Sequence, residues 1–345
     1  MRLTSFQYLL VFITSLLLCG LLTPLMKNLA IKFSIVDKPN QAHKTHFGSV
    51  PYLGGLAIMA TIWSVTLCGS LLIQIGRSTF EILLSILLPA TLLGLIGLWD
   101  DIKNLSPLPR FVAQTLGGCF TAGFIVSTNT IGLPTGNDIQ DFVITVFWIV
   151  GITNAVNFFD NLDGGASGSV TISSLGLFAL ALISGQFYVA TLSLVLAGSA
   201  FGFLFWNRNP AKIYMGDAGA LFLGMLLATL LVRFEPNLIN SYAGYAIPVM
   251  IVALPILDTS VALSSRLRRG KSLFQGGTDH LSHRLLRRGF TSTRCALILW
   301  LLTLVFVLLA ILISNVSYKY ESIILLTSLI LWAFLYFKFM EQSDE

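Results

Sequence analysis

The stretch CALILWLLTLVFVLLAILIS, residues 295–314, decides the fold class of this chain. It contains no charged side chain, and a helix of about 20 mostly apolar residues is long enough to cross a bilayer. Similar stretches recur along the sequence, in which 55% of the 345 residues are apolar and only 11% are charged. Soluble domains carry roughly 25% charged residues. The sequence therefore predicts an all-α protein that crosses a membrane many times, and it excludes a soluble globular protein.

Eleven ranges have the length and composition of a spanning helix. The longest polar interval between them, near residues 264–294, is too short for a separate soluble domain. We therefore expect a single integral membrane domain over residues 1–345. Short glycine-rich joints between the fifth and eighth ranges leave ten spans as the alternative. The ranges are 6–26, 52–73, 80–99, 109–128, 141–158, 164–184, 187–206, 218–234, 241–263, 295–314 and 322–338.

The distribution of Lys and Arg predicts the orientation, because cytoplasmic loops of membrane proteins carry an excess of both. With the N-terminus outside, seventeen of the 21 Lys and Arg residues fall on the cytoplasmic side. This arrangement places the C-terminus in the cytoplasm. It also attributes the net charge of +5 to loops that face anionic lipid rather than to nucleic-acid binding. The expected cytoplasmic loops lie near residues 27–51, 100–109, 158–163, 207–217 and 264–294.

The same side collects nine of the eleven aspartates and all four histidines. The excess of Lys and Arg does not explain this, because acidic residues contribute little to orientation. We therefore expect a functional site at this face, assembled from four clusters of polar residues.

The first cluster is WDDIK, residues 99–103, at the inner end of the third range. Two adjacent carboxylates at a membrane boundary repel each other and resist the loss of water, so a bound cation would stabilise both. Asp100 and Asp101 are therefore candidates for catalysis or cation binding. The alternative is a polar helix end in a solvated loop.

The second cluster is NAVNFFDNLDGG, residues 154–165. Asn154 and Asn157 are three residues apart and share a helix face, and Asp160 and Asp163 repeat this spacing. The alternative is a turn in which Asp163 caps the following helix. Capping accounts for one aspartate only, so the cluster predicts a ligand site.

The third cluster is NRNPAKIYMGDAG, residues 207–219, with Asp217 between two glycines at the start of the eighth range. The N-terminus of a helix suits an anionic ligand or a metal ion that carries phosphates. Arg208 and Lys212 add positive charge nearby. A helix cap is again the alternative for Asp217.

The fourth cluster lies in the basic loop, where GGTDHLSHR, residues 276–284, places His280 and His283 among several arginines. The arginines alone fit topology and lipid contact. The histidines suggest more, because an imidazole can donate to a phosphate or transfer a proton. Asp258 precedes this loop, near the inner end of the ninth range.

Taken together, the clusters supply carboxylates and amides without cysteine, which is the ligand set of Mg²⁺ rather than of zinc. Arginine, lysine and histidine side chains suit the phosphates themselves. The residues thus indicate a Mg²⁺-dependent membrane enzyme that acts on phosphates.

At these clusters the chain resembles the polyprenyl-phosphate N-acetylhexosamine-1-phosphate transferases, which are of the glycosyltransferase family 4 type. The resemblance runs from DKP at 37–39 and PYLGG at 51–55 to His283, and so covers most of the chain. It implies that an oxygen of a polyprenyl phosphate attacks the β-phosphate of a UDP-sugar. UMP then leaves, and a lipid-diphosphate-sugar remains. The form DHLSHR, residues 279–284, looks closer to the branch that transfers GlcNAc-1-phosphate to undecaprenyl phosphate than to the muramoyl-pentapeptide branch.

The resemblance also implies roles for single residues. Asp217 matches the family's Mg²⁺ ligand, with Mn²⁺ as a possible substitute. Asp100 and Asp101 match a pair assigned to the lipid phosphate nucleophile or to metal binding. The other matches are Asn157, Asp160 and Asp163 near nucleotide and metal, with Asn157 and Asp160 as further metal ligands, Asn207 and Tyr214 at the uridine, Lys103 and Arg110 at phosphates, His280 and His283 beside the diphosphate and sugar, and His46 as a further substrate contact.

Two positions depart from the family pattern. Ser282 stands where the motif His-x-His-His commonly has its middle histidine, and Ala220 stands where many members have serine. The first departure concerns the sugar site, and neither concerns the expected metal ligands.

From the resemblance we expect a multi-pass protein of the bacterial inner membrane with its active site at the cytoplasmic face. Its expected partners are UDP-N-acetylhexosamine, undecaprenyl phosphate and membrane lipids, without nucleic acid, and a homodimer is one option for its assembly. The alternative function is a transporter or flippase for lipid-linked or phosphorylated sugars. Such a protein should place ionisable groups near mid-membrane and often contains internal repeats, whereas this sequence has its acids at one face and no visible repeat. A scaffolding protein is a third option, and the intact acidic set argues against it.

Overall fold

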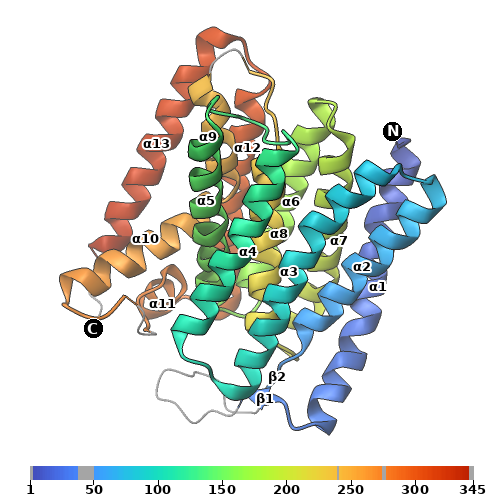
Figure 1. Ribbon diagram of the computed structural model, residues 1–345. Coiled ribbons are helices and arrows are strands. Elements are labelled where there is room, and N and C mark those ends of the chain that lie inside the picture. The colour runs from blue at the N-terminus through green and yellow to red at the C-terminus, as the bar shows by residue number, and fades with distance from the viewer. Residues whose placement is uncertain (1–2, 38–49, 239–240, 274–276, 342–345) are drawn as a thin grey trace.

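The computed structural model describes residues 3–37, 50–238, 241–273 and 277–341. Over these residues the chain is almost entirely helical, which confirms the predicted all-α membrane fold (Figure 1). The only sheet in the described part is one antiparallel pair, β1 (Val36–Asp37) with β2 (Val50–Pro51). The helices are α1 Ser5–Lys32, α2 Gly54–Ile73, α3 Arg77–Lys103, α4 Pro107–Ser127, α5 Asp138–Phe159, α6 Gly165–Ile183, α7 Phe187–Asn207, α8 Gly216–Arg233, α9 Ser241–Ile251, α10 Ala253–Arg268, α11 Leu281–Arg287, α12 Ser292–Ile313 and α13 Tyr318–Met340.

Each of the eleven ranges expected to span a membrane contains a helix. Among the described helices, nine are long and apolar enough to cross a membrane, and the bent pair α9 and α10 makes a tenth. The remaining range, 109–128, corresponds to α4, which has 21 residues but falls outside this set. Its early turns carry Arg110 and Gln114, which lower its apolar character. By length and composition the count is therefore nine or ten, which agrees with the lower of the two predicted numbers.

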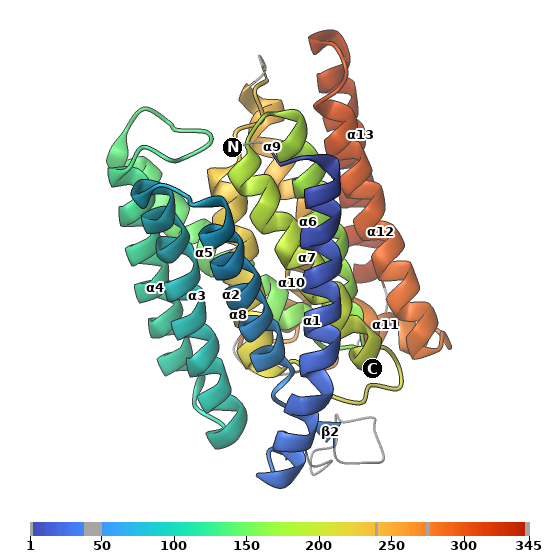
Figure 2. The same cartoon turned by 90° about the vertical axis from the view of Figure 1, so that its right-hand side faces the viewer.

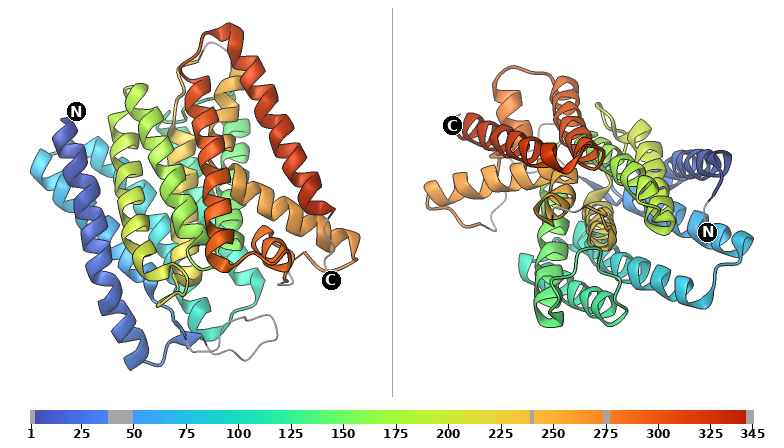
Figure 3. Two further views of the ribbon diagram at one scale, coloured as in Figure 1. Left: turned by 180° about the vertical axis from the view of Figure 1, so that it is seen from behind. Right: turned by 90° about the horizontal axis from the view of Figure 1, so that it is seen from above.

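The helices form a bundle with α8 near its centre (Figures 1 and 3). Helix α8 packs against α3, α5 and α2, while α7 lies between α6 and α1. Helices α7 and α8 are mostly buried, whereas α1 and α13 at the edges expose many large apolar side chains, as expected of surfaces that face lipid. Helix α1 begins at one end of the bundle, and α13 finishes at the other (Figure 2).

The ninth range is a broken helix, so the prediction of one continuous span at 241–263 is wrong in this respect. The axes of α9 and α10 differ by 76° at Val252. Pro255 accounts for the break, because a proline ring clashes with the carbonyl four residues earlier, here that of Ile251, and cannot donate to it. The freed Ile251 carbonyl accepts a hydrogen bond of 2.6 Å from Ser173 Oγ instead. Helix α10 consequently runs across the bundle (Figure 1).

One end of the bundle gathers the connections that carry the polar clusters. The turn from α3 to α4, the pair β1 and β2, and the short helix α11 all lie toward the lower end in Figure 1. The links from α5 to α6 and from α7 to α8 reach the same end, because these helices alternate in direction.

Candidate active site

Asp217, on the first turn of α8, is the centre of a cluster of polar side chains. Its Oδ1 accepts a hydrogen bond of 2.8 Å from the Asn157 amide of α5, and its Oδ2 accepts one from Arg110 Nη1 of α4. The same Arg110 nitrogen donates to Asp100 Oδ2 of α3 at 2.6 Å. The Asp217 and Arg110 side chains are 25% and 27% exposed, so a ligand could reach them. The structure thus brings together Asp100, Arg110, Asn157 and Asp217, and one guanidinium faces two carboxylates.

Asp101 has a different place from its neighbour Asp100. Its two oxygens accept hydrogen bonds from the backbone N–H groups of Asp217 at 2.9 Å and Ala218 at 3.1 Å. These are N–H groups of the first turn of α8, which have no partner within their own helix. Gly216 makes this contact possible, since it has a φ of +68° and a side-chain carbon there would lie 2.3 Å from Asp101 Oδ2. Asp101 therefore caps α8 from another helix and fixes the turn that carries Asp217.

The PYLGG segment, residues 51–55, supports the same turn. The N–H groups of Gly54 and Gly55 at the start of α2 donate to the carbonyls of Tyr214 and Met215, each at 3.0 Å, and Tyr214 N–H donates to Pro51 O at 2.9 Å. The Tyr214 ring lies 6.1 Å from the ring of Tyr52, at an angle of 49°. Burial and the nearby Asp163 raise the pKa of Tyr214, so its phenol stays protonated. Its predicted stacking on uracil stays a prediction.

Asp163 and Asn207 are both occupied by contacts within the protein. Asp163 Oδ2 accepts hydrogen bonds from the Asn209 amide at 2.9 Å and from Ala211 N–H at 3.0 Å. Asn207 is only 2% exposed. Its oxygen accepts from Gly164 N–H at 3.1 Å and from Ser167 Oγ at 2.9 Å. A uridine contact by Asn207 would therefore have to replace bonds that join α7 to the start of α6.

Asp160 is the half-buried carboxylate that lacks a hydrogen bond to any described residue. Burial, together with the charges of Asp217 and Asp163, raises the pKa of Asp160 to about 7. A divalent cation would stabilise the ionised form of such a group. The described residues contain no set of three or more His, Cys, Asp or Glu side chains in metal-binding geometry. Mg²⁺ needs no such set, since it is commonly held by one or two carboxylates, substrate phosphates and water. The donor set of Asp217, Asn157 and Asp160 therefore fits this ion.

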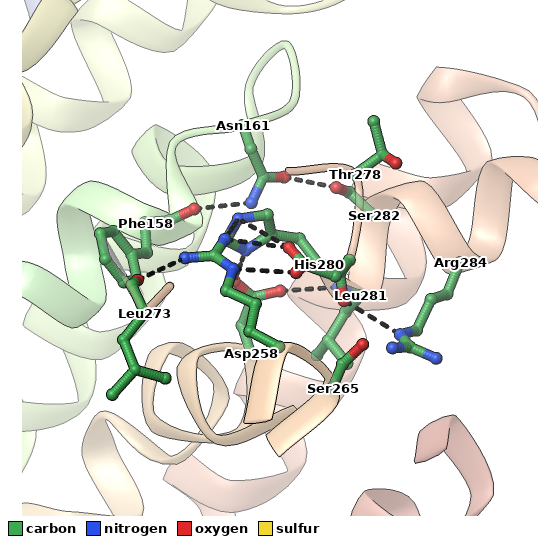
Figure 4. Close-up of polar contacts among 12 residues, drawn as sticks. Phe158, Asn161, Asp258, Ser265, Leu273, Thr278, His280, Leu281, Ser282 and Arg284 are labelled. Carbon is green, nitrogen blue, oxygen red and sulfur yellow. Dashed lines mark hydrogen bonds and ion pairs between the residues drawn. The ribbon is translucent and has the colours of Figure 1, made fainter. Parts of the chain in front are cut away.

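The histidine loop is held by a buried ionic network (Figure 4). Arg266 of α10 donates twice to Asp279, from Nε and from Nη2, at 2.9 Å each. Arg266 also donates to Leu273 O at 2.9 Å. His280 lies against this pair, and its Nδ1 is 2.7 Å from Asp258 Oδ2. His280 is only 6% exposed, so the structure places it as a buried side chain rather than at an open surface.

The last turn of α5 connects the polar side chains around Asp217 with the histidine loop. Asn157 bonds to Asp217, as described above, and the next residue, Phe158, packs its ring edge-on against His280 with centroids 6.1 Å apart. Asn161 follows this turn and accepts a hydrogen bond from Ser282 Oγ of α11. The fourth cluster is thereby held beside the other three, as the sequence predicts.

Two predicted residues do not join these contacts. Lys103 is exposed on the last turn of α3, and its side chain forms no hydrogen bond with the described residues. His46 lies outside the described residues. Arg266, Asp279 and Asp258 have no role that was predicted from the sequence. The signal for Asp258 was present, because an aspartate in an apolar range just after a proline needs a buried partner.

His283 gives a testable pH effect. Its Nδ1 is buried without a hydrogen-bond partner among the described residues, and burial lowers the pKa of His283 to about 4. An unfolded histidine has a pKa of about 6.5, so between these values the unfolded chain binds more protons than the folded one. The stability that His283 contributes is therefore complete above about pH 6.5 and is lost as the pH falls toward 4.

We expect the melting temperature of the wild-type protein in detergent to fall over this interval more steeply than that of a His283→Gln variant. Glutamine has hydrogen-bonding groups of similar reach and does not titrate. The pH dependence of the variant's melting temperature therefore comes only from the other titratable groups of the protein. Parallel curves for the two proteins would contradict the assignment.

Comparison with known proteins places these residues in a family. The sequence profile of "Glycosyl transferase family 4" matches residues 83–235, which include Asp100, Arg110, Asn157 and Asp217. A Bacillus subtilis (strain 168) protein described as a probable undecaprenyl-phosphate N-acetylglucosaminyl 1-phosphate transferase is 33% identical over 320 residues. The match covers 89% of this chain and 85% of that protein.

Two further relatives belong to two kinds of transferase. A decaprenyl-phosphate N-acetylglucosaminephosphotransferase of Mycolicibacterium smegmatis is 31% identical, over 85% of this chain and 78% of the relative. A phospho-N-acetylmuramoyl-pentapeptide-transferase of Limosilactobacillus fermentum is 33% identical, but over only 61% of this chain and 67% of the relative. The matches to the N-acetylglucosamine enzymes extend over more of the chain, in agreement with the branch that its histidine motif favours. The chain therefore belongs to glycosyl transferase family 4 and is a sugar-phosphate transferase of the polyprenyl-phosphate N-acetylhexosamine-1-phosphate transferase family.

Proposed function

We propose that this membrane enzyme transfers GlcNAc-1-phosphate from UDP-GlcNAc to undecaprenyl phosphate in a reaction that requires Mg²⁺. An oxygen of the lipid phosphate forms a bond to the β-phosphorus of the nucleotide sugar. The bond from that phosphorus to the bridging oxygen breaks, and UMP leaves. The product is a lipid-diphosphate-sugar that can prime a cell-envelope polysaccharide. The observation that supports this most is the meeting of Asp217, Asp100, Arg110 and Asn157 at the N-terminus of α8.

The residues of the site have separate tasks in this proposal. Arg110 carries the positive charge that a phosphate group would meet between α3 and α8, and Asp100 orients the guanidinium through the bond of 2.6 Å. Asp217, Asn157 and Asp160 would hold the Mg²⁺ ion, which when bound neutralises charge on the diphosphate and on the departing UMP. The lipid phosphate is already anionic near neutral pH, so the reaction needs positioning more than it needs a strong base.

The site faces the cytoplasm in this proposal, and the enzyme resides in the bacterial inner membrane. The support is the excess of Lys and Arg in the loops at the same end as Asp217, since such loops are usually retained inside. There a water-soluble nucleotide sugar can meet a lipid whose phosphate stays at the membrane interface.

The direct test is a transfer assay with the purified protein in detergent or nanodiscs. With radiolabelled UDP-GlcNAc and undecaprenyl phosphate, we expect UMP and a labelled lipid in equal amounts. Both should vanish with EDTA and return with Mg²⁺ or Mn²⁺. Other UDP-N-acetylhexosamines in the same assay decide the sugar. Failure to form UMP from any of them, combined with movement of a separately supplied labelled lipid-diphosphate-sugar across vesicle membranes, would favour the flippase alternative.

A further inference from the structure

Asp258 is a fully buried carboxylate at the centre of the network that holds the histidine loop. It lies on α10, three residues after Pro255, and is 0% exposed. Both of its oxygens are used, since Oδ1 accepts the backbone N–H of Leu281 at 2.7 Å and Oδ2 lies 2.7 Å from His280 Nδ1 (Figure 4). A buried carboxylate is an acceptor when ionised, so His280 Nδ1 is the donor in this pair.

The other nitrogen of the ring faces a group that can only donate. His280 Nε2 lies 3.4 Å from Arg266 Nη2, and a guanidinium has no acceptor, while the carboxylate oxygen Asp279 Oδ1 is 3.8 Å away, beyond hydrogen-bond distance. Nε2 must therefore be the acceptor and carry no proton. A proton there would set two donors against each other in a buried space, next to the Arg266 and Asp279 pair. The geometry around the ring thus selects the neutral tautomer with its proton on Nδ1.

We propose that Asp258 is a positioning residue that fixes His280 in the Nδ1–H tautomer and thereby holds the loop of Asp279 to His283 against the end of α5. This inference rests on the proposed function, because it assigns a part in the transfer reaction to a side chain that does not face the substrate. The chain of contacts runs from Asp258 through His280 to Arg266, and from Arg266 to Asp279. Every bond in it crosses between α10 and the loop.

The link to the reacting groups passes through α5. Ser282 donates to Asn161, Phe158 packs against His280, and Asn157 on the same helix bonds to Asp217. A wrong tautomer of His280 would push Arg266 away and release the loop from this helix end. Replacing a side chain that orients catalytic groups typically lowers activity 10- to 100-fold, so a loss of that size in kcat is expected.

The variant Asp258→Asn tests the assignment. Asparagine Oδ1 can still accept from Leu281 N–H, but its NH₂ group would face His280 Nδ1 and favour the tautomer with its proton on Nε2. The sequence has only four histidines, so ¹⁵N-histidine labelling gives few signals, and a His280→Asn variant identifies the one that belongs to His280. We expect the Nδ1–H tautomer in the wild-type protein at neutral pH and the Nε2–H tautomer in Asp258→Asn. In the transfer assay kcat should fall about 10- to 100-fold, while KM for the nucleotide sugar changes less.

A matched control is Asp141→Asn at the other end of α5. Asp141 is 6% exposed and accepts one backbone N–H, that of Thr135 at 2.8 Å, so this variant also replaces a buried acceptor but touches no histidine. It should keep the wild-type kcat and the wild-type His280 signal. If Asp258→Asn fails to fold, the double variant with His280→Asn gives a second reading, because the side-chain oxygen of the asparagine at 280 can accept a hydrogen bond from the NH₂ group of the asparagine at 258.

The outcomes separate the inference from the proposed function. A wild-type His280 that carries its proton on Nε2, or on both nitrogens, overturns the inference whatever the enzyme transfers. A switch of tautomer in Asp258→Asn with unchanged kcat also overturns the positioning role. The predicted tautomers in a protein that releases no UMP would support the network and reject the proposed reaction instead.

Discussion

Replacing Asp217 by asparagine is expected to lower kcat/KM of sugar-phosphate transfer by roughly 10²- to 10³-fold, the loss seen when one preorganised electrostatic group is removed from an active site. The change removes the negative charge that would bind Mg²⁺. It also exchanges an acceptor for an NH₂ group, although both Asp217 oxygens face donors, from Asn157 and from Arg110. The new NH₂ group would then face either the Asn157 amide or the Arg110 guanidinium, which are donors as well.

The measurement combines transfer kinetics with binding of Mn²⁺ followed by electron paramagnetic resonance. We expect the variant to lose both rate and metal affinity while it elutes as the wild-type protein does in size-exclusion chromatography. Asp138→Asn is the control, because Asp138 is exposed at the opposite end of α5. An Asp217→Asn enzyme with the wild-type rate would refute the metal assignment, and a large loss in Asp138→Asn would refute the placing of the site.

The second large effect is expected from Gly97→Ala in α3. A side-chain carbon at this position would lie 2.5 Å from the backbone oxygen of Asp217 and 2.7 Å from the nitrogen of Ala218. Backbone atoms cannot rotate away as a flexible side chain can, so α3 and α8 must separate. Overpacking of this kind costs about 1–3 kcal/mol of folding free energy. A shift of about 1 Å in the turn that carries Asp217 could lower the rate by roughly 10²-fold.

Gly151→Ala provides the matched control for this prediction. Gly151 also lies inside a helix, α5, but no atom lies within 4 Å of the side-chain carbon it would gain. Alanine should therefore leave the rate unchanged and stabilise the helix by about 0.5–1 kcal/mol. Thermal unfolding in detergent and transfer rates of the two variants give the comparison. Equal behaviour of Gly97→Ala and Gly151→Ala would contradict the tight contact between α3 and α8.

The spanning helices could be predicted well from the sequence because each depends on a local property, the length of an apolar run. The break between α9 and α10 was not predicted, although Pro248 and Pro255 lie in that range. A proline in an apolar run either bends a helix slightly or breaks it, and the choice depends on whether neighbours satisfy the freed carbonyl. Here Ser173 of another helix does so.

That the aspartates lie close together could also be predicted, but the different role of each one could not. Asp100 and Asp101 are adjacent and look equivalent in the sequence. In the structure one faces Arg110 and the other caps α8, whose first turn is more than a hundred residues away. Likewise Asn207 resembles a ligand in sequence, whereas its amide is used by Gly164 and Ser167. Such partners depend on tertiary packing, and the sequence around each side chain contains no trace of them.

The contact between Asp101 and Gly216 also constrains how this chain can evolve. Alanine at 216 would collide with the Asp101 carboxylate, and a side chain shorter than aspartate at 101 would no longer reach the N–H groups of Asp217 and Ala218. A single substitution at either position is therefore expected to give a less active enzyme. We expect that the two positions, one on each of two helices, covary among descendants of this sequence or do not change at all.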